Sequence, residues 1–382
     1  MRQIFNLLQT CNPRLALFVA ILSLAMAGPA YSQVTAAAGY TPPDNTPSLK
    51  VGLVFYGNYT YTSTPKSLDA DGNTISPNSF DVARSYLNFT GNINHRIAYR
   101  ITPDITRASA NGATNGTTIN NSLVFRIKYA FVQFNMDDWT GQWKQTWVRM
   151  GANQTPFVDW EEGIYRYRFQ GTVFAERVGR LTSSDFGVSF HTNLPKNYGE
   201  IHTGVYNGDG YSAVEANNRK AFQTRVTIRP LATSSNLNAR GFRGTAFYDS
   251  DTYMKNDEKK RLVLQALYEH PHFTAAFDWM DAKDKTTAAA ADLHGRGYSI
   301  WATPAFKEKN NGPELLLRWD SYVPNRTNTS AKQNMVLVGA SYWFPHEGSV
   351  TTSLLVDEEI VTFPGQATAR QRRTAVHLLV NY

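Results

Sequence analysis

Apolar and polar residues alternate with a period of two in short segments that recur along most of the chain. Because successive side chains of a β-strand point to opposite faces, each segment predicts a strand with one apolar and one polar side. The segment 125–131, for example, assigns to one face Phe125, Ile127, Tyr129 and Phe131, and to the other Arg126 and Lys128. A chain built from such strands is all-β.

The number and spacing of these segments narrow the fold further. About 16 can be counted, an even number as in most bacterial membrane barrels. They lie at 49–61, 83–89, 97–102, 125–131, 148–153, 185–193, 199–206, 220–229, 241–249, 260–269, 272–281, 296–304, 312–322, 334–343, 348–358 and 371–382. Connections after odd-numbered segments are long and most others are short, as in barrels with long outer loops and short periplasmic turns. We therefore predict a transmembrane antiparallel β-barrel of about 16 strands, with both termini periplasmic.

The start of the chain predicts export. Arg2 and Arg14 precede an uncharged, mostly apolar run at 15–27, and small residues follow it, so we expect cleavage before Gln33. An N-terminal membrane anchor is the alternative. The predicted division is a signal peptide at 1–32, a short periplasmic segment at 33–48 and a barrel domain at 49–382. Cleavage removes Cys11, the single cysteine, so we expect no disulfide and no thiolate chemistry.

The end of the chain resembles the insertion signal of outer-membrane barrels. Alternating apolar residues run to an aromatic terminus through Val376, Leu378, Val380 and Tyr382. Aromatic residues make up 13% of the chain, which suits girdles at two membrane interfaces. Together with the signal peptide, these features predict the outer membrane of a Gram-negative bacterium.

The polar faces of the predicted strands are rich in arginine and lysine. An arginine turned toward lipid near the midplane would cost about 2–4 kcal/mol, so we place these residues in a water-filled lumen. The longest outer connection, 154–184, is the third, and its Arg166 and Arg168 share one side if the chain is extended there. We expect this loop to fold inward and form the constriction. Alternatively, it is a surface loop whose arginines pair with its own acids or with lipopolysaccharide.

Positive charge in the lumen predicts an anion pathway, because guanidinium groups bind phosphate and carboxylate oxygens in pairs. The candidate residues for this pathway and its constriction are Arg84, Arg100, Arg126, Lys128, Arg149, Arg166, Arg168 and Arg225.

Four stretches resemble the phosphate-selective porin O/P family in order and spacing. They are ARSYLNFTG at 83–91, RMGANQTPF at 149–157, VYNGDGY at 205–211 and KAFQTRVTIRP at 220–230. The resemblance covers most of the mature chain. It implies a trimeric barrel of about 16 strands with a basic, tyrosine-lined eyelet. It does not imply phosphate selectivity, because the family is broader than that activity.

The predicted function is passive diffusion of small anions, with phosphate and other oxyanions as candidate solutes. Alternatives are a non-selective general porin, a plugged structural or adhesive barrel, a soluble periplasmic β protein and, less favoured, an outer-membrane enzyme. We expect no enzymatic activity, cofactor or metal: His270 and His272 flank a tight turn, and no Gly-rich phosphate loop, GxSxG or HExxH motif occurs. The expected partners are small anionic solutes, outer-membrane lipid, lipopolysaccharide and two further copies of the chain. Nucleic acid is not expected, because the arginines are dispersed at strand spacing.

Overall fold

The structure is a computed structural model that describes residues 45–108, 113–114, 117–118, 122–215, 217–253, 257–285, 287, 289–346, 350–367 and 370–382. The predicted signal peptide, 1–32, lies outside the described residues, as does most of the predicted segment 33–48. Within the described parts of the chain, no helix is both long and apolar enough to cross a membrane.

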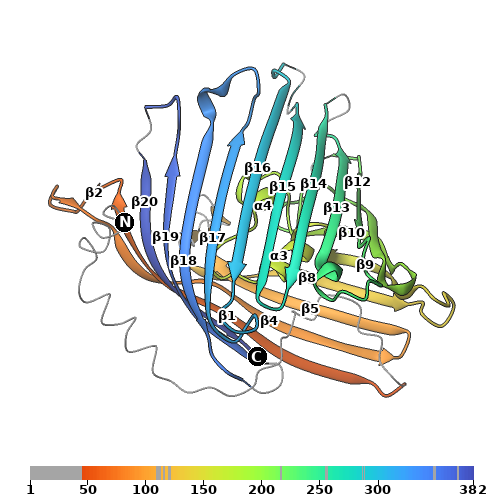
Figure 1. Ribbon diagram of the computed structural model, residues 1–382. Helices are drawn as coiled ribbons and strands as arrows, with labels where there is room; N and C mark the ends of the chain where they lie inside the picture. Colours follow the sequence, from red (N-terminus) through yellow and green to blue (C-terminus); the bar gives the residue numbers. More distant parts are fainter. Residues whose placement is uncertain are drawn as a thin grey trace.

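Sixteen long strands of the described residues close into one antiparallel barrel (Figure 1), which confirms the predicted fold class. The strands are β1 (Ser48–Thr64), β4 (Asn78–Asn94), β5 (Ile97–Arg107), β8 (Leu123–Asn135), β9 (Lys144–Gln154), β10 (Ser184–Asn193), β11 (Gly199–Tyr206), β12 (Ala221–Ile228), β13 (Phe242–Asp251), β14 (Lys259–His270), β15 (Phe273–Asp284), β16 (Leu293–Pro304), β17 (Gly312–Val323), β18 (Gln333–Trp343), β19 (Thr351–Thr362) and β20 (Gln371–Asn381). Neighbours in sequence pair in order, and β1 pairs with β20 to close the ring.

The remaining elements lie in the connections. Two small hairpins are β2 (Ser67–Leu68) with β3 (Thr74–Ile75) and β6 (Ala113–Thr114) with β7 (Thr117–Thr118). The helices are α3 (Val158–Tyr165) and α4 (Phe174–Arg177), and the 3₁₀ turns are η1 (Pro195–Asn197), η2 (Asn238–Gly241) and η3 (Thr329–Ala331).

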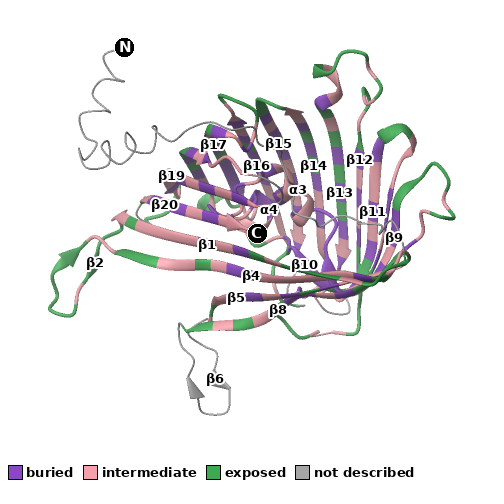
Figure 2. Ribbon diagram, turned by 90° about the horizontal axis from the view of Figure 1, so that it is seen from below, coloured by how far each residue is buried: buried purple, intermediate pink, exposed green. Residues whose placement is uncertain are grey.

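The two faces of the barrel wall differ in polarity, as the alternation predicts. Apolar side chains such as Phe125, Ile300 and Val338 are 67%, 50% and 51% exposed on the outside. Polar and charged side chains such as Arg149 and Arg225 are buried on the inside. Burial therefore alternates along the strands in Figure 2. A closed sheet with an apolar outer face leaves no backbone edge for lipid to contact.

A β-bulge at Lys128 changes which side chains of β8 face inward. Thr102 of β5 is opposite Tyr129, but Pro103 is opposite Ile127, so Lys128 has no partner residue. Proline has no N–H to donate to the ladder and is found at such irregularities. The extra residue turns Tyr129 inward, together with Phe131. The predicted single alternation over 125–131 is therefore wrong beyond Lys128.

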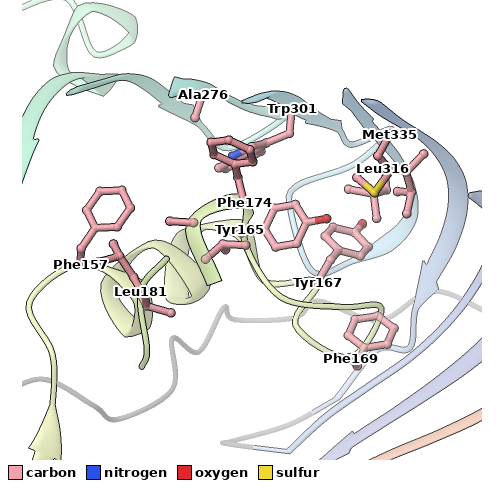
Figure 3. Packing of buried hydrophobic residues seen from close by; sticks show 14 of the residues in the cluster. Phe157, Tyr165, Tyr167, Phe169, Phe174, Leu181, Ala276, Trp301, Leu316 and Met335 are labelled. Atoms are coloured by element: carbon pink, nitrogen blue, oxygen red, sulfur yellow. The ribbon is translucent and has the colours of Figure 1, made fainter. Parts of the chain in front are cut away.

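The connection 155–183 between β9 and β10, here called the inner loop, lies inside the barrel with α3 and α4 (Figures 1 and 2). Its buried side chains include Phe157, Tyr165, Tyr167, Phe169 and Phe174. They pack against inward apolar residues of the wall, as Figure 3 shows for Ala276, Trp301, Leu316 and Met335. The inner loop thus covers the wall at β15–β18 with a second, apolar layer. This packing offsets the conformational entropy lost by fixing a long loop.

Candidate functional site

A cavity of about 360 Å³ lies between the inner loop and the part of the wall that it leaves uncovered. Its wall residues come from β1, β4, β5 and β8–β14 and from β18–β20, whereas β15–β17 contribute none. On the loop side it is lined by Asp159, Trp160, Glu162, Arg166 and Arg168. The lumen is therefore filled with apolar side chains on one side and remains polar and open on the other.

Basic side chains outnumber acidic ones around this cavity by eight to four. The basic residues are Arg100, Lys128, Arg149, Arg166, Arg168, Arg225, Arg243 and Lys309. The acidic residues are Asp159, Glu162, Glu200 and Glu269. A narrow, low-dielectric passage concentrates this excess of positive charge and attracts anions.

Two of the acids are held by strand residues. Glu200 accepts a hydrogen bond of 2.8 Å from Arg225 and lies 3.1 Å from the His191 ring. Glu269 is bridged by Arg243, at 2.5 Å, and by Lys309. Each of these two carboxylates is therefore paired with at least one cationic side chain.

Glu162, in the inner loop, lies 2.5 Å from Arg168. Burial raises the pKa of Glu162 to about 8, although the Arg168 guanidinium opposes the shift. At neutral pH its carboxyl is therefore mostly protonated and adds little negative charge to the cavity.

Lys128 and Arg100 have no carboxylate partner among the described residues. The Lys128 ammonium, on a side chain that is nearly buried, lies 5.0 Å from the Tyr86 ring and 5.2 Å from the Tyr129 ring. It makes no hydrogen bond to any described residue. Arg100 donates to the neutral oxygens of Asn88 and Thr102, both at 2.9 Å. Asp159, an acid of the inner loop that also lines the cavity, accepts a hydrogen bond of 2.6 Å from the Tyr129 hydroxyl and forms no ion pair with either cation. Lys128 and Arg100 are therefore not neutralised by direct contact with a carboxylate of the described residues.

Aromatic rings fix the cations of the wall in place. Arg149 lies between Trp147, at 3.8 Å from guanidinium carbon to ring centroid, and Phe131, at 4.6 Å. Its Nε and Nη1 donate to Gln133 and Gln154, both at 2.7 Å. Cation–π contacts of this kind are worth about 0.5–2 kcal/mol and hold a guanidinium without neutralising it.

The two loop arginines both line the cavity, as their predicted shared side implies, but each has an acidic partner. Arg166 forms an ion pair with Glu314 of β17 and also donates to Thr303. Arg168 pairs with Glu162 within the loop. Glu314 therefore compensates the charge of Arg166. The charge of Arg168 is compensated only when Glu162 is ionised.

Arg84 and Arg126 lie apart from this cavity and form a separate cluster. Both bond to one carboxylate oxygen of Asp104, at 2.6 and 2.9 Å, and both donate to the Tyr211 hydroxyl, at 3.1 and 2.8 Å. The cluster keeps an excess of one positive charge. The other six predicted site residues line the cavity.

The sequence-based selection missed Arg243, Lys309 and the aromatic lining. Arg243 alternates with the outward Phe242, so the period-two pattern contains a signal for it. Lys309 lies in a connection between strands, where no pattern could place it. Tyr129 was missed because the bulge that turns it inward has no clear signal in the sequence.

No protein-family model matches the chain, and no curated protein matches it in sequence. Solved structures do match. An anion-selective porin from Comamonas acidovorans superposes with a TM-score of 0.58 at 13% identity, covering 88% of this chain and all of that one. The outer-membrane channel DcaP of Acinetobacter baumannii gives 0.58 at 12% identity, covering 90% and 100%. The trimer form of OmpT, an outer-membrane protein of Vibrio cholerae, gives 0.53 at 9% identity, covering 88% and 99%. At these identities the likeness establishes a shared fold, a closed 16-stranded barrel of the porin type.

Proposed function

We propose that this chain forms a water-filled channel in the bacterial outer membrane for the passive diffusion of small anions. Cleavage of residues 1–32 and periplasmic termini belong to this proposal. The fold supports it, because a 16-stranded barrel is wide enough to hold an aqueous channel. The anion-selective porin from Comamonas acidovorans has the same fold, which adds support.

The observation that carries the anion preference is the charge of the cavity lining, with eight basic and four acidic residues. The acids are each bonded within the protein, whereas Lys128 and Arg100 form no direct ion pair with a carboxylate of the described residues. A permeating anion therefore finds donors that need no rearrangement to bind it. A cation meets the same charges as a barrier.

The lining favours oxyanions, such as phosphate or small carboxylates, over halides. Guanidinium and ammonium donors on facing surfaces can each bond a different oxygen of one solute. The nearby rings of Tyr86 and Tyr129 restrict the passage around Lys128. We include oxyanion preference, with phosphate as one candidate, as the finer part of the proposal.

We further propose that the chain assembles as a homotrimer surrounded by outer-membrane lipid and lipopolysaccharide. The outward face of the described strands is apolar, as contact with lipid or with another barrel requires. The likeness to the trimer form of OmpT supports the trimer.

Conductance in a planar bilayer under a salt gradient tests the proposal. We expect a reversal potential on the anion side and a chloride current that added phosphate reduces. Lys128→Gln should lower the anion-to-cation permeability ratio by about fivefold, since one unit charge at close range in water is worth roughly 1 kcal/mol. Lys260→Gln removes a cation that Glu258 already pairs at the outer end of β14, and should leave the ratio nearly unchanged.

Other outcomes separate the alternatives. Open channels with cation preference, or none, would contradict the anion preference and indicate a general porin. Folded barrels without conductance would indicate a plugged structural barrel, whose inner loop closes the lumen.

A further inference from the structure

Two carboxyl groups meet where the inner loop contacts the wall. Glu161 of α3 and Asp278 of β15 are each 1% exposed. The side-chain amide nitrogen of Gln265 on β14 donates to Glu161 Oε1, at 3.3 Å, and to Asp278 Oδ1, at 2.7 Å. Because one amide nitrogen donates to both carboxyls, the two carboxyl groups lie next to each other.

The remaining oxygens of this pair, Glu161 Oε2 and Asp278 Oδ2, are buried and have no donor among the described residues. Two adjacent carboxylates in a water-poor site repel each other strongly, so one of them takes up a proton. A proton held between Oε2 and Oδ2 removes the repulsion and gives each oxygen a partner.

The charges around the pair also indicate that it holds one proton. Arg318 of β17 directs two nitrogens to Asp320, at 3.0 and 2.8 Å, and Arg177 of the inner loop also bonds to Asp320, at 2.8 Å. Two guanidinium groups thus stand against three carboxyls, those of Glu161, Asp278 and Asp320. One added proton makes the group neutral.

Burial, followed by the charge of Asp278, raises the pKa of Glu161 well above its usual range. Arg318 and the side chain of Trp301 on β16 oppose the shift without cancelling it. The described groups that act on Glu161 from β14 to β17 are thus Gln265, Asp278, Trp301 and Arg318, and together they favour a protonated pair.

We propose that Glu161 is a positioning residue, which shares one proton with Asp278 and thereby holds the inner loop against the wall and fixes the width of the channel. This inference rests on the proposed function only in that the loop borders the conducting passage. The shared proton makes the channel sensitive to alkaline pH. The carboxyl pair holds this proton when the loop is docked and loses it when the loop is undocked.

The sign follows from linkage. A free carboxyl ionises at about pH 4, and the docked pair does so at a higher pH. Between these two values docking takes up one proton, so the equilibrium constant for docking falls by up to about tenfold per pH unit. Above the pKa of the docked pair, two facing carboxylates remain and the docked loop stays weakened. Glu161→Gln supplies a permanent N–H to Asp278 and removes the dependence.

Single-channel recordings from about pH 5 to about pH 9 test this, because the range begins above the ordinary pKa of a free carboxyl, where the linkage sets in. In the unmodified protein the frequency of brief closures should rise at least about tenfold across this range, following the linkage slope. Glu161→Gln should stay within about twofold, and Asp278→Asn should behave likewise, because either amide replaces the shared proton with a fixed hydrogen. The matched control is Glu258→Gln, an exposed outer-loop acid paired with Lys260, which should keep the pH response of the unmodified protein. A pH-independent unmodified channel, or a Glu161→Gln channel that keeps the response, would overturn the proposal.

Infrared spectroscopy of the folded barrel in detergent tests the shared proton without any conductance. Glu162→Gln serves as the background, because it removes the neighbouring carboxyl whose pKa is raised to about 8. In this background at neutral pH the protein should show a protonated carboxylic-acid band that is lost when Glu161→Gln or Asp278→Asn is added. If the band is present but no current flows, the proposed channel function fails and the proton pair stands. If both variants retain the band, the pair is refuted even in a conducting channel. Having two variants protects the test against a folding failure in one of them.

Discussion

Arg166 crosses from the inner loop to Glu314 of β17, placing Nη2 3.0 Å from Oε2 although the residues are 148 positions apart. Glu314 is fully buried and also accepts a hydrogen bond of 2.9 Å from the Tyr167 hydroxyl. This carboxylate therefore fastens the loop at two successive side chains.

Arg166→Met should strongly destabilise the barrel, because it leaves the Glu314 carboxylate buried without its cation, at a cost of about 3–5 kcal/mol. Urea unfolding in detergent micelles would measure the change. Replacing both residues by Met should recover much of the loss, because no buried charge then remains. If the double variant is as unstable as the sum of the two single ones, the pair is not coupled.

Gly151→Ala should prevent β9 from pairing correctly. Gly151 has a φ of +123°, which only glycine adopts readily, and an added Cβ would lie 2.3 Å from the Ala130 carbonyl oxygen. Gly244→Ala on β13 is the matched control, since its Cβ would meet nothing within 4 Å. The fraction of heat-resistant folded barrel on a gel would show the difference. Equal folding of the two variants would contradict the backbone geometry.

Asp104→Asn should increase anion preference. The substitution removes the one carboxylate of the Arg84 and Arg126 cluster and leaves two guanidinium groups facing the Tyr211 hydroxyl. The reversal potential should shift further to the anion side. Asp138→Asn serves as the control, because this acid lies half-exposed in the turn between β8 and β9 and pairs there with His95 and Arg96.

Anion preference should decrease as the pH is raised through about 8, because burial raises the pKa of Glu162 to about 8. Below that pH the carboxyl is neutral; above it, the cavity gains one negative charge near Lys128. Reversal potentials at several pH values would follow the change. Glu162→Gln should remove it, whereas a slope that survives in this variant would assign the titration to another group.

The strand order and most strand positions could be predicted from the sequence, because period-two burial is a local property. The expected segment 199–206 coincides with β11, and 185–193 differs from β10 by one residue. By contrast, β4 (Asn78–Asn94) extends five residues beyond each end of the expected segment 83–89, and β1 (Ser48–Thr64) ends three residues beyond the expected segment 49–61.

The candidate site was only partly predictable, because its shape depends on contacts distant in sequence. Alternation placed Arg84 and Arg126 on the inner face, but both pair with Asp104 and neither lines the cavity. No local pattern could indicate that Arg166 meets Glu314 or that Glu161 meets Asp278. The reversal of facing at Lys128 depends on Pro103 in a neighbouring strand.

The apolar second layer has a consequence for the order of folding. The inner loop precedes β10, yet the strands that it covers, β15–β18, are completed more than 90 residues later in the chain. The loop cannot dock until the barrel has nearly closed, because its contacts join residues that are distant in sequence. Such contacts carry a large entropic cost of loop closure and therefore form late. Assembly therefore passes through an almost complete cylinder with a wide, unobstructed interior, and the narrow passage appears only as the final event.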